Sequence, residues 1–267
     1  MSNIFKGTRA LVTGASSGLG EQFARQIAAM GADLVITARS TDKLEALAAE
    51  LHSNNGIDVK VVSQDLAATG GALELCKKVD ALGVPIDHLI NNAGFGNSSR
   101  FHECDLERET QMVRLNSEAV IVLARHFLPG MVSRRKGGVL SVASVAGMPP
   151  TPYLSTYGAT KAFVVSWTSG VAEELRGSGV RVSALCPGPV PTGFQEAAGV
   201  GIDGADKLLV LSAEETVRRG LKAYAQSKVI FVPGAMNKIG MLGVKFTPRN
   251  LAARVVGAAM KDSIKGA

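Results

Sequence analysis

Short apolar runs alternate with longer amphipathic stretches along most of the chain. Between the runs, apolar residues recur about every 3.6 positions, as Leu19, Phe23, Ile27 and Met30 do, which predicts helices. Continuously apolar strands separated by helices indicate a parallel sheet that is covered on both faces. The sequence therefore predicts an α/β fold, a doubly wound parallel sheet of about seven strands with helices on both faces. The predicted strands are Ala10–Thr13, Leu34–Ala38, Val59–Ser63, His88–Asn91, Val139–Ala143, Val180–Cys186 and Val229–Val232.

The chain is predicted to form a single domain over all 267 residues, because no linker, repeat or change of composition divides it. Residues 193–212 and 235–250 are its least regular parts and mix Gly, Met and Lys. In doubly wound folds ligands bind beyond the carboxyl ends of the strands, so we expect both segments to form a substrate lid. Their apolar side chains predict a pocket for medium-sized hydrophobic ketones or aldehydes. These are Phe194, Leu208, Leu209, Leu211, Met241, Leu242 and Phe246.

Composition excludes several classes of protein. Hydrophobic residues make up 46% and charged residues 19%, a balance that excludes intrinsic disorder. The net charge of +6 comes from scattered basic residues and aromatic residues are only 5%, so no nucleic-acid partner is expected. The three cysteines lack a C-x-x-C pair, which indicates reduced thiols and no metal site. No apolar stretch approaches the ~18 residues of a membrane span, so a cytoplasmic protein without a membrane partner is expected.

A glycine-rich turn follows the first predicted strand and precedes an amphipathic helix. It reads T-G-A-S-S-G-L-G from Thr13 to Gly20. Glycines at such a turn let the backbone approach a pyrophosphate, which the helix N-terminus stabilises. The spacing G-x-x-x-G-x-G differs from the commoner dinucleotide pattern, and a merely tight turn is the alternative. The candidate cofactor-binding residues are Gly14, Ser16, Ser17, Gly18, Leu19 and Gly20.

The end of the second predicted strand bears on the choice of nicotinamide cofactor. An acidic residue at this point would bind the ribose 2′-hydroxyl of NAD(H). The chain has Ala38, Arg39 and Ser40 there instead. The Arg39 guanidinium can pair with a 2′-phosphate and Ser40 adds a hydroxyl, so NADP(H) is predicted over NAD(H). The alternative is that Arg39 is only a solvated loop cation.

Tyr157 and Lys161 are four residues apart, so on a helix their side chains share one face. A free tyrosine has a pKa of about 10, and a nearby ammonium favours the phenolate. The pair could therefore carry out proton transfer near neutral pH. Taken alone the spacing is common, and a surface pair is the alternative.

Together these motifs resemble the short-chain dehydrogenase/reductase family, over approximately residues 5–195. The glycine turn, the run Asn91-Asn92-Ala93-Gly94, and Tyr157 with Lys161 occur in the family's order. Ser144 lies thirteen residues before the tyrosine, and Asn116 matches the remaining catalytic position. The segment Cys186–Gly193 resembles the family's nicotinamide-side segment. The resemblance implies a single-domain, Rossmann-like fold.

The resemblance also implies roles for individual residues. Tyr157 would exchange a proton with the carbonyl or alcohol oxygen, and Ser144 would position that oxygen. Lys161 would hold the nicotinamide ribose and lower the pKa of the tyrosine, and the Asn116 backbone would hold a water in a proton relay. Ser17 stands where a basic residue would reinforce NADP(H) preference, which leaves that preference to Arg39. The further implied cofactor contacts are Asp65, Leu66, Asn92, Ala93, Gly94, Pro187, Gly188, Val190 and Thr192.

The predicted activity is that of an NADP(H)-dependent carbonyl reductase or alcohol dehydrogenase that acts on a small, apolar carbonyl or alcohol substrate. One alternative is a 3-oxoacyl-carrier-protein reductase, because a basic surface would suit an acidic carrier. The other is a non-catalytic, nucleotide-sensing regulatory protein that has kept the fold. Such regulators usually lose the tyrosine or the lysine, and both are present here. The resemblance further implies a homodimer or homotetramer.

Overall fold

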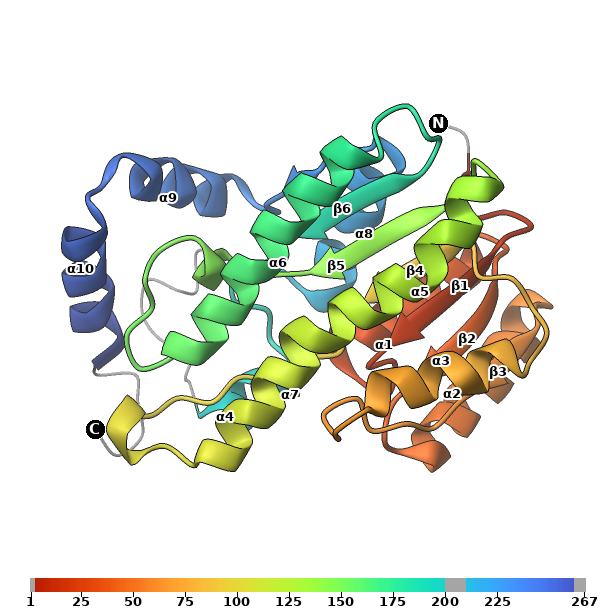
Figure 1. The fold of residues 1–267 in the computed structure, drawn as a ribbon, viewed down its shortest axis with the longest axis horizontal. Coiled ribbons are helices and arrows are strands. Elements are labelled where there is room, and N and C mark those ends of the chain that lie inside the picture. The colour runs from red at the N-terminus through yellow and green to blue at the C-terminus, as the bar shows by residue number, and fades with distance from the viewer. Residues whose placement is uncertain (1–2, 200–209, 262–267) are drawn as a thin grey trace.

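A computed structural model describes residues 3–199 and 210–261. Seven parallel strands form one sheet in the order β3-β2-β1-β4-β5-β6-β7 (Figure 1). All seven predicted strands are present. The ends of β4 are as predicted, those of the other strands differ by one or two residues, and β3, β6 and β7 are shorter than predicted. The strands are β1 (Arg9–Thr13), β2 (Asp33–Thr37), β3 (Val59–Val61), β4 (His88–Asn91), β5 (Gly138–Val142), β6 (Arg181–Leu185) and β7 (Ile230–Phe231).

Helices cover both faces of the sheet, which confirms the doubly wound, Rossmann-like architecture. Apolar side chains alternate along each strand, so that Val12 packs toward one helical layer and Leu11 toward the other. The first layer contains α1 (Gly18–Ala29), α2 (Thr41–Asn55) and α8 (Ala213–Ala225). The second contains α3 (Gly71–Asp80), α5 (Ala119–Ser133) and α6 (Ser155–Glu174).

The remaining helices lie around the carboxyl ends of the strands or outside the layers. α4 (Leu106–Val113) begins at Asp105, whose carboxylate accepts hydrogen bonds from the N–H groups of Glu107 and Arg108. Short 3-10 turns form at Phe101–Glu103 and Val145–Gly147. The other helices are α7 (Gly193–Ala198), α9 (Ala235–Phe246) and α10 (Arg249–Lys261). Among the described helices, none has the length and apolarity that crossing a membrane requires.

The two segments that we expected to be irregular differ from that expectation. Residues 235–250 form α9 and the start of α10, so the prediction of irregular structure there is wrong. The glycines of this stretch lie inside α9, where Gly240 and Gly243 meet no atoms that would exclude a side chain. Within 193–212 the structure shows α7, and Leu208 and Leu209 lie outside the described residues.

The order of the strands creates a crevice at one edge of the sheet. After β1 the chain builds β2 and β3 on one side, and it then returns to place β4 on the other side of β1. Loops that follow β1 and β4 therefore diverge at the carboxyl edge, which is where ligands bind in such sheets. The segments after β2, β5 and β6 end at the same edge.

Candidate active site

An open cavity of about 680 Å³ lies at the carboxyl edge of the sheet. Residues that follow β1, β2, β3, β4, β5 and β6 line it, together with residues of α4, α6 and α7. Three cations, Arg39, Arg108 and Lys161, line the cavity, and Asp65 is the only carboxylate among its described lining residues. The cavity is large enough for a small-molecule ligand, and its charge favours an anionic one.

The glycine turn is packed so closely that side chains would not fit. Gly14 and Gly18 have φ angles of 68° and 57°, in the left-handed region that favours glycine. A Cβ on Gly20 would lie 2.0 Å from the carbonyl oxygen of Gly14, so helix α1 approaches the turn without a spacer. The side chain of Ser17, the N-cap residue, makes no capping hydrogen bond. The N–H groups at the start of α1 thus remain available to a phosphate at the cavity wall.

Two side chains hold this turn to the end of β4. The Asn92 amide nitrogen donates to the carbonyl oxygen of Thr13 at 2.9 Å. The Thr13 hydroxyl oxygen accepts from the N–H groups of Asn92 and Ala93, each at 3.0 Å. Asn92 was predicted as a cofactor contact, and it also fixes the shape of the turn. Thr13 was missed as a positioning residue, because a threonine at the end of a strand carries no recognisable signal.

Arg39 and Ser40 lie exposed at the end of β2 and line the cavity. The backbone here is fixed by the next strand, since the Ser63 hydroxyl donates to the carbonyl oxygen of Arg39. The Asp65 carboxylate lies in the same region and accepts from the N–H of Ala67 at 2.8 Å. The guanidinium thus lies at the cavity end where β2 and β3 terminate.

Tyr157 lies in the first turns of α6, with only 7% of its surface exposed, and faces the cavity. Burial raises the pKa of its hydroxyl to about 12, and a hydrogen bond with the Ser144 side chain opposes that rise. The phenol is therefore fully protonated near neutral pH. This direction is opposite to the predicted lowering, because loss of hydration outweighs the stabilisation of a phenolate in this arrangement.

Lys161 is buried one helical turn further along α6. Its ammonium lies 5.7 Å from the centre of the Tyr157 ring and donates to the carbonyl oxygen of Val142 at 2.8 Å. Burial lowers the pKa of Lys161 to about 8. The helical spacing of the two residues therefore brings both into one buried site, and the surface-pair alternative is excluded.

Asn116 is fully buried in a π-helical turn, Arg114–Glu118, between α4 and α5. Its amide nitrogen donates to the carbonyl oxygen of Phe95 at 2.9 Å, and its amide oxygen accepts from the Phe95 N–H at 3.2 Å. The same nitrogen is 3.2 Å from the hydroxyl of Thr160 on α6. Asn116 therefore ties α6 to the loop after β4. Turns of this kind often occur at functional sites.

Apolar side chains surround Tyr157 at the other end of the cavity. Its ring packs against Phe194 of α7, with centroids 5.4 Å apart. Phe95, Leu115 and Leu154 complete this wall. Of the residues that were expected to form an apolar pocket, Phe194 lines the cavity and Leu211 does not. The side chains of Met241 and Leu242 lie outside the described part of the structure. Phe246 is 78% exposed and does not line the cavity, so its predicted place there is wrong.

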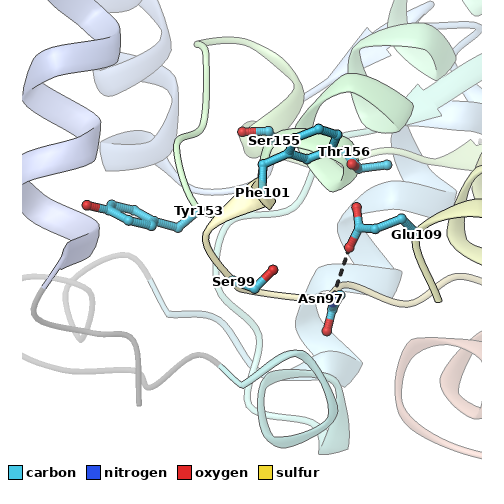
Figure 2. Close-up of a pocket in the computed structure, with 7 residues that line it drawn as sticks. All are labelled: Asn97, Ser99, Phe101, Glu109, Tyr153, Ser155 and Thr156. Atoms are coloured by element: carbon cyan, nitrogen blue, oxygen red, sulfur yellow. Dashed lines mark hydrogen bonds between the residues drawn. The ribbon is translucent and has the colours of Figure 1, made fainter. Parts of the chain in front are cut away.

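The polar side of this end is built from α4, which sequence reasoning missed because no motif marks it. Arg108 lies 5.3 Å above the Phe95 ring and donates to the Asn97 side-chain oxygen at 3.0 Å. Asn97 and Glu109 point toward each other in Figure 2 and share a hydrogen bond of 2.8 Å. The small cleft beside them has a volume of about 10 Å³, which suits one water molecule and no substrate.

The cavity gathers nearly all the candidate residues. Only Gly20 and Asn116 do not line it, and both act on neighbours that do, through close packing and hydrogen bonds respectively. The predicted residues that line the cavity are Gly14, Ser16, Ser17, Gly18, Leu19, Arg39, Ser40, Asp65, Leu66, Asn92, Ala93, Gly94, Ser144, Tyr157, Lys161, Pro187, Gly188, Val190 and Thr192.

Comparison with known proteins agrees with the family resemblance that the sequence motifs indicated. The family model described as "short chain dehydrogenase" matches residues 8–201. A very-long-chain 3-oxoacyl-CoA reductase of Phaeosphaeria nodorum is 39% identical over 186 residues, which are 67% of this chain and 54% of that protein. This chain thus spans about half the length of that relative.

Solved structures match over nearly the whole chain. A short-chain dehydrogenase from Sphingobium yanoikuyae in complex with NADPH has a TM-score of 0.80 and 29% identity, and the match covers 97% of both chains. A short-chain dehydrogenase/reductase from Burkholderia phymatum in complex with NAD has a TM-score of 0.79 and 26% identity. That match covers 90% of this chain and 93% of the other.

Proposed function

This chain belongs to the short-chain dehydrogenase family, and we propose that it is an NADP(H)-dependent oxidoreductase that reduces the 3-oxo group of an apolar acyl thioester. The observation that carries the proposal is the single cavity in which a protonated Tyr157, Ser144 and Lys161 meet an apolar wall. The name of the Phaeosphaeria relative supports the 3-oxoacyl substrate, and the NADPH complex of the Sphingobium enzyme supports the cofactor.

The residues of the cavity fit a dinucleotide with a 2′-phosphate. Gly14 and Gly18 line the cavity beside the start of α1 and carry no side chain, so a pyrophosphate could approach the backbone there. Gly20 lets α1 pack directly on the Gly14 carbonyl. Arg39 and Ser40 would hold the 2′-phosphate, and Lys161 would hold the ribose next to the nicotinamide. The bound cofactor supplies the hydride. The loop that ends at Thr192 lies against Gly18 and would close over the cofactor.

The chain's own contribution to the reaction is a proton and its placement. A phenol that stays protonated can donate to a carbonyl oxygen as negative charge develops there. The Ser144 hydroxyl oxygen accepts from the N–H of Ala146 at 3.1 Å, and the same hydroxyl lies within hydrogen-bond reach of Tyr157. Its proton would turn to the substrate oxygen when a carbonyl binds beside Tyr157. The Lys161 ammonium stabilises the phenolate that remains. Asn116 holds the loop at Phe95 against α6 and so fixes the position of that loop relative to the helix that carries Tyr157 and Lys161.

The substrate end combines an apolar wall with two polar groups. Phe95, Leu154 and Phe194 can contact an acyl chain, while Arg108 and Gln111 line the same cavity from α4. The Arg108 guanidinium is held by Asn97 and Phe95, and it can donate to the carbonyl oxygen of a thioester or to an anionic group. A sugar would find few partners on this wall.

A substrate series with NADPH oxidation as the readout tests the proposal. We expect turnover with 3-oxoacyl-CoA esters and with bulky apolar ketones, and much lower efficiency with sugars. The saturated acyl-CoA esters, which lack the ketone, are the control and should not be turned over. If sugars or short charged oxoacids were reduced far more efficiently than every 3-oxoacyl ester, the substrate proposal would be wrong.

A homodimer or homotetramer is also proposed, on the family resemblance alone. Phe163 on α6 has 38% of its surface exposed, so this helix presents an apolar side chain to a possible neighbour. Sedimentation of the purified protein measures its oligomeric state directly. A monomer at micromolar concentration would contradict the proposed oligomer.

A further inference from the structure

The helices α9 and α10 lie at one end of the molecule, outside the layers that cover the sheet (Figure 1). The inner side of α10 packs on the body of the protein. Ala252 is buried, and Met260 packs against the apolar cluster that contains Leu154 and Tyr157. Gly257 lies close to Pro152, since a Cβ there would be 3.3 Å from the proline ring. α10 is therefore anchored beside the active-site cavity by one face only.

The opposite side of both helices exposes large apolar side chains in rows. On α9, Met236, Ile239 and Phe246 are 50%, 63% and 78% exposed. On α10, Leu251 and Val255 are 51% and 60% exposed. Steps of three, four and seven residues place each set on one side of its helix. Exposed apolar residues that are grouped in this way mark an interaction surface, whereas scattered ones do not.

The charge of the same segment has one sign. From Ala235 to Lys261, the span of these two helices, the sequence contains five Lys and Arg residues and no Asp or Glu. Four of these cations, Lys238, Arg249, Arg254 and Lys261, are exposed on α9 and α10. On α10, Arg254 lies one residue before Val255, and Lys261 lies two turns further along the same side. We call this combination of apolar and basic residues the docking face.

The signs of these charges decide what can cover the docking face. A two-fold contact between two copies would place this basic face against itself, and neither copy has an Asp or Glu on α9 or α10 to pair with the cations of the other. An anionic bilayer satisfies both features, because apolar side chains enter the headgroup boundary while Lys and Arg pair with lipid phosphates. We propose that α9 and α10 dock this protein on the surface of an anionic phospholipid bilayer, with both helices lying in the interface.

Co-sedimentation of the full-length protein with vesicles tests this proposal without any assay of activity. We expect binding to vesicles of phosphatidylcholine mixed with phosphatidylglycerol, and at least tenfold weaker binding to phosphatidylcholine alone. Replacing Arg254 and Lys261 by Gln should weaken binding to the anionic vesicles about 25-fold, since each cation near such a surface contributes about fivefold. Raising the salt concentration should also weaken binding.

Matched variants separate the docking face from the overall charge of the protein. Lys77→Gln with Lys78→Gln removes the same charge from α3, in the layer on the sheet, and should leave vesicle binding nearly unchanged. Leu251→Ser with Val255→Ser should weaken binding, whereas Leu73→Ser on α3 should not, although Leu73 is 56% exposed. Equal binding to both kinds of vesicle, no binding to either, or equal losses with the α10 and α3 variants would each overturn the proposal. Binding that persists in Tyr157→Phe would show that docking is independent of catalysis.

Discussion

Acid should destabilise this protein through His88, a fully buried residue of β4. The Nε2 atom lies 3.2 Å from the carbonyl oxygen of Ile4, and the Nδ1 atom lies 2.9 Å from the hydroxyl of Tyr224 on α8. A carbonyl only accepts, so Nε2 carries the proton of the neutral ring and Nδ1 accepts from the Tyr224 hydroxyl. A second proton on Nδ1 would remove that acceptor and place a charge in the core.

Burial, opposed by the hydrogen bond to Ile4, lowers the pKa of His88 from 6.5 to about 4. Between these two values the unfolded chain binds a proton that the folded protein does not bind. The free energy of unfolding therefore falls as the pH drops below 6.5, by about 2 kcal/mol at pH 5 and about 3 kcal/mol below pH 4 from this residue alone. Above pH 6.5 this contribution is constant.

Denaturant unfolding at a series of pH values between 7 and 5 measures the slope of the free energy of unfolding against pH. NMR of the His88 ring reports its protonation in the folded protein. His88→Leu with Tyr224→Phe removes both partners and should flatten the slope, although it lowers stability overall. His102→Asn is the control and should keep the slope, because the His102 side chain is 77% exposed. A folded-state His88 that titrates near pH 6.5 would refute the reasoning.

Three further predictions concern the cofactor. Arg39→Ala should reduce the ratio of NADPH to NADH affinity about 10- to 100-fold, as expected for a charge-assisted pair worth about 1.5–3 kcal/mol. Ala38→Asp should reverse the preference for NADPH. An unchanged ratio of dissociation constants in Arg39→Ala would show that Arg39 does not recognise the 2′-phosphate. Gly20→Ala should weaken NADPH binding at least about tenfold, because its Cβ would overlap the Gly14 carbonyl. Gly170→Ala is the control, since Gly170 has open space around it. This variant should bind NADPH normally, and its free energy of unfolding should rise by about 0.5–1 kcal/mol. Because the pKa of Lys161 is lowered to about 8, its ammonium is lost above that pH, and the affinity for NADPH should fall there. An affinity that stays constant up to pH 10 would contradict the proposed contact between the Lys161 ammonium and the ribose.

Much of the fold was predictable, because parallel strands buried on both faces leave an unambiguous apolar run. The run His88–Asn91 became β4 with the predicted bounds. The glycine turn and the Tyr157–Lys161 spacing were equally readable, since close backbone approach and a shared helical face leave a mark on the local sequence.

The features that depend on tertiary environment were not predictable in this way. The pKa of Tyr157 is set by the loss of water around the phenol, and that loss involves Phe194, which lies 37 residues further along the chain. The role of Arg108 depends on its packing against Phe95. The expectation of no membrane partner rested on the absence of a long apolar stretch. Which side chains of α9 and α10 face solvent is decided by their packing on the body, and that exposure is what supports docking on a lipid surface.

Replacing Tyr157 by Phe tests the central claim most directly. The variant loses the proposed proton donor and keeps the ring that packs against Phe194, so the site should stay folded. With a 3-oxoacyl-CoA ester, the NADPH oxidation rate should fall about 10²- to 10⁴-fold, while the dissociation constant for NADPH stays within about twofold. Tyr153→Phe is the matched control and should keep native turnover, because Tyr153 lines the small cleft and not the main cavity. Near-native turnover of Tyr157→Phe would contradict the account.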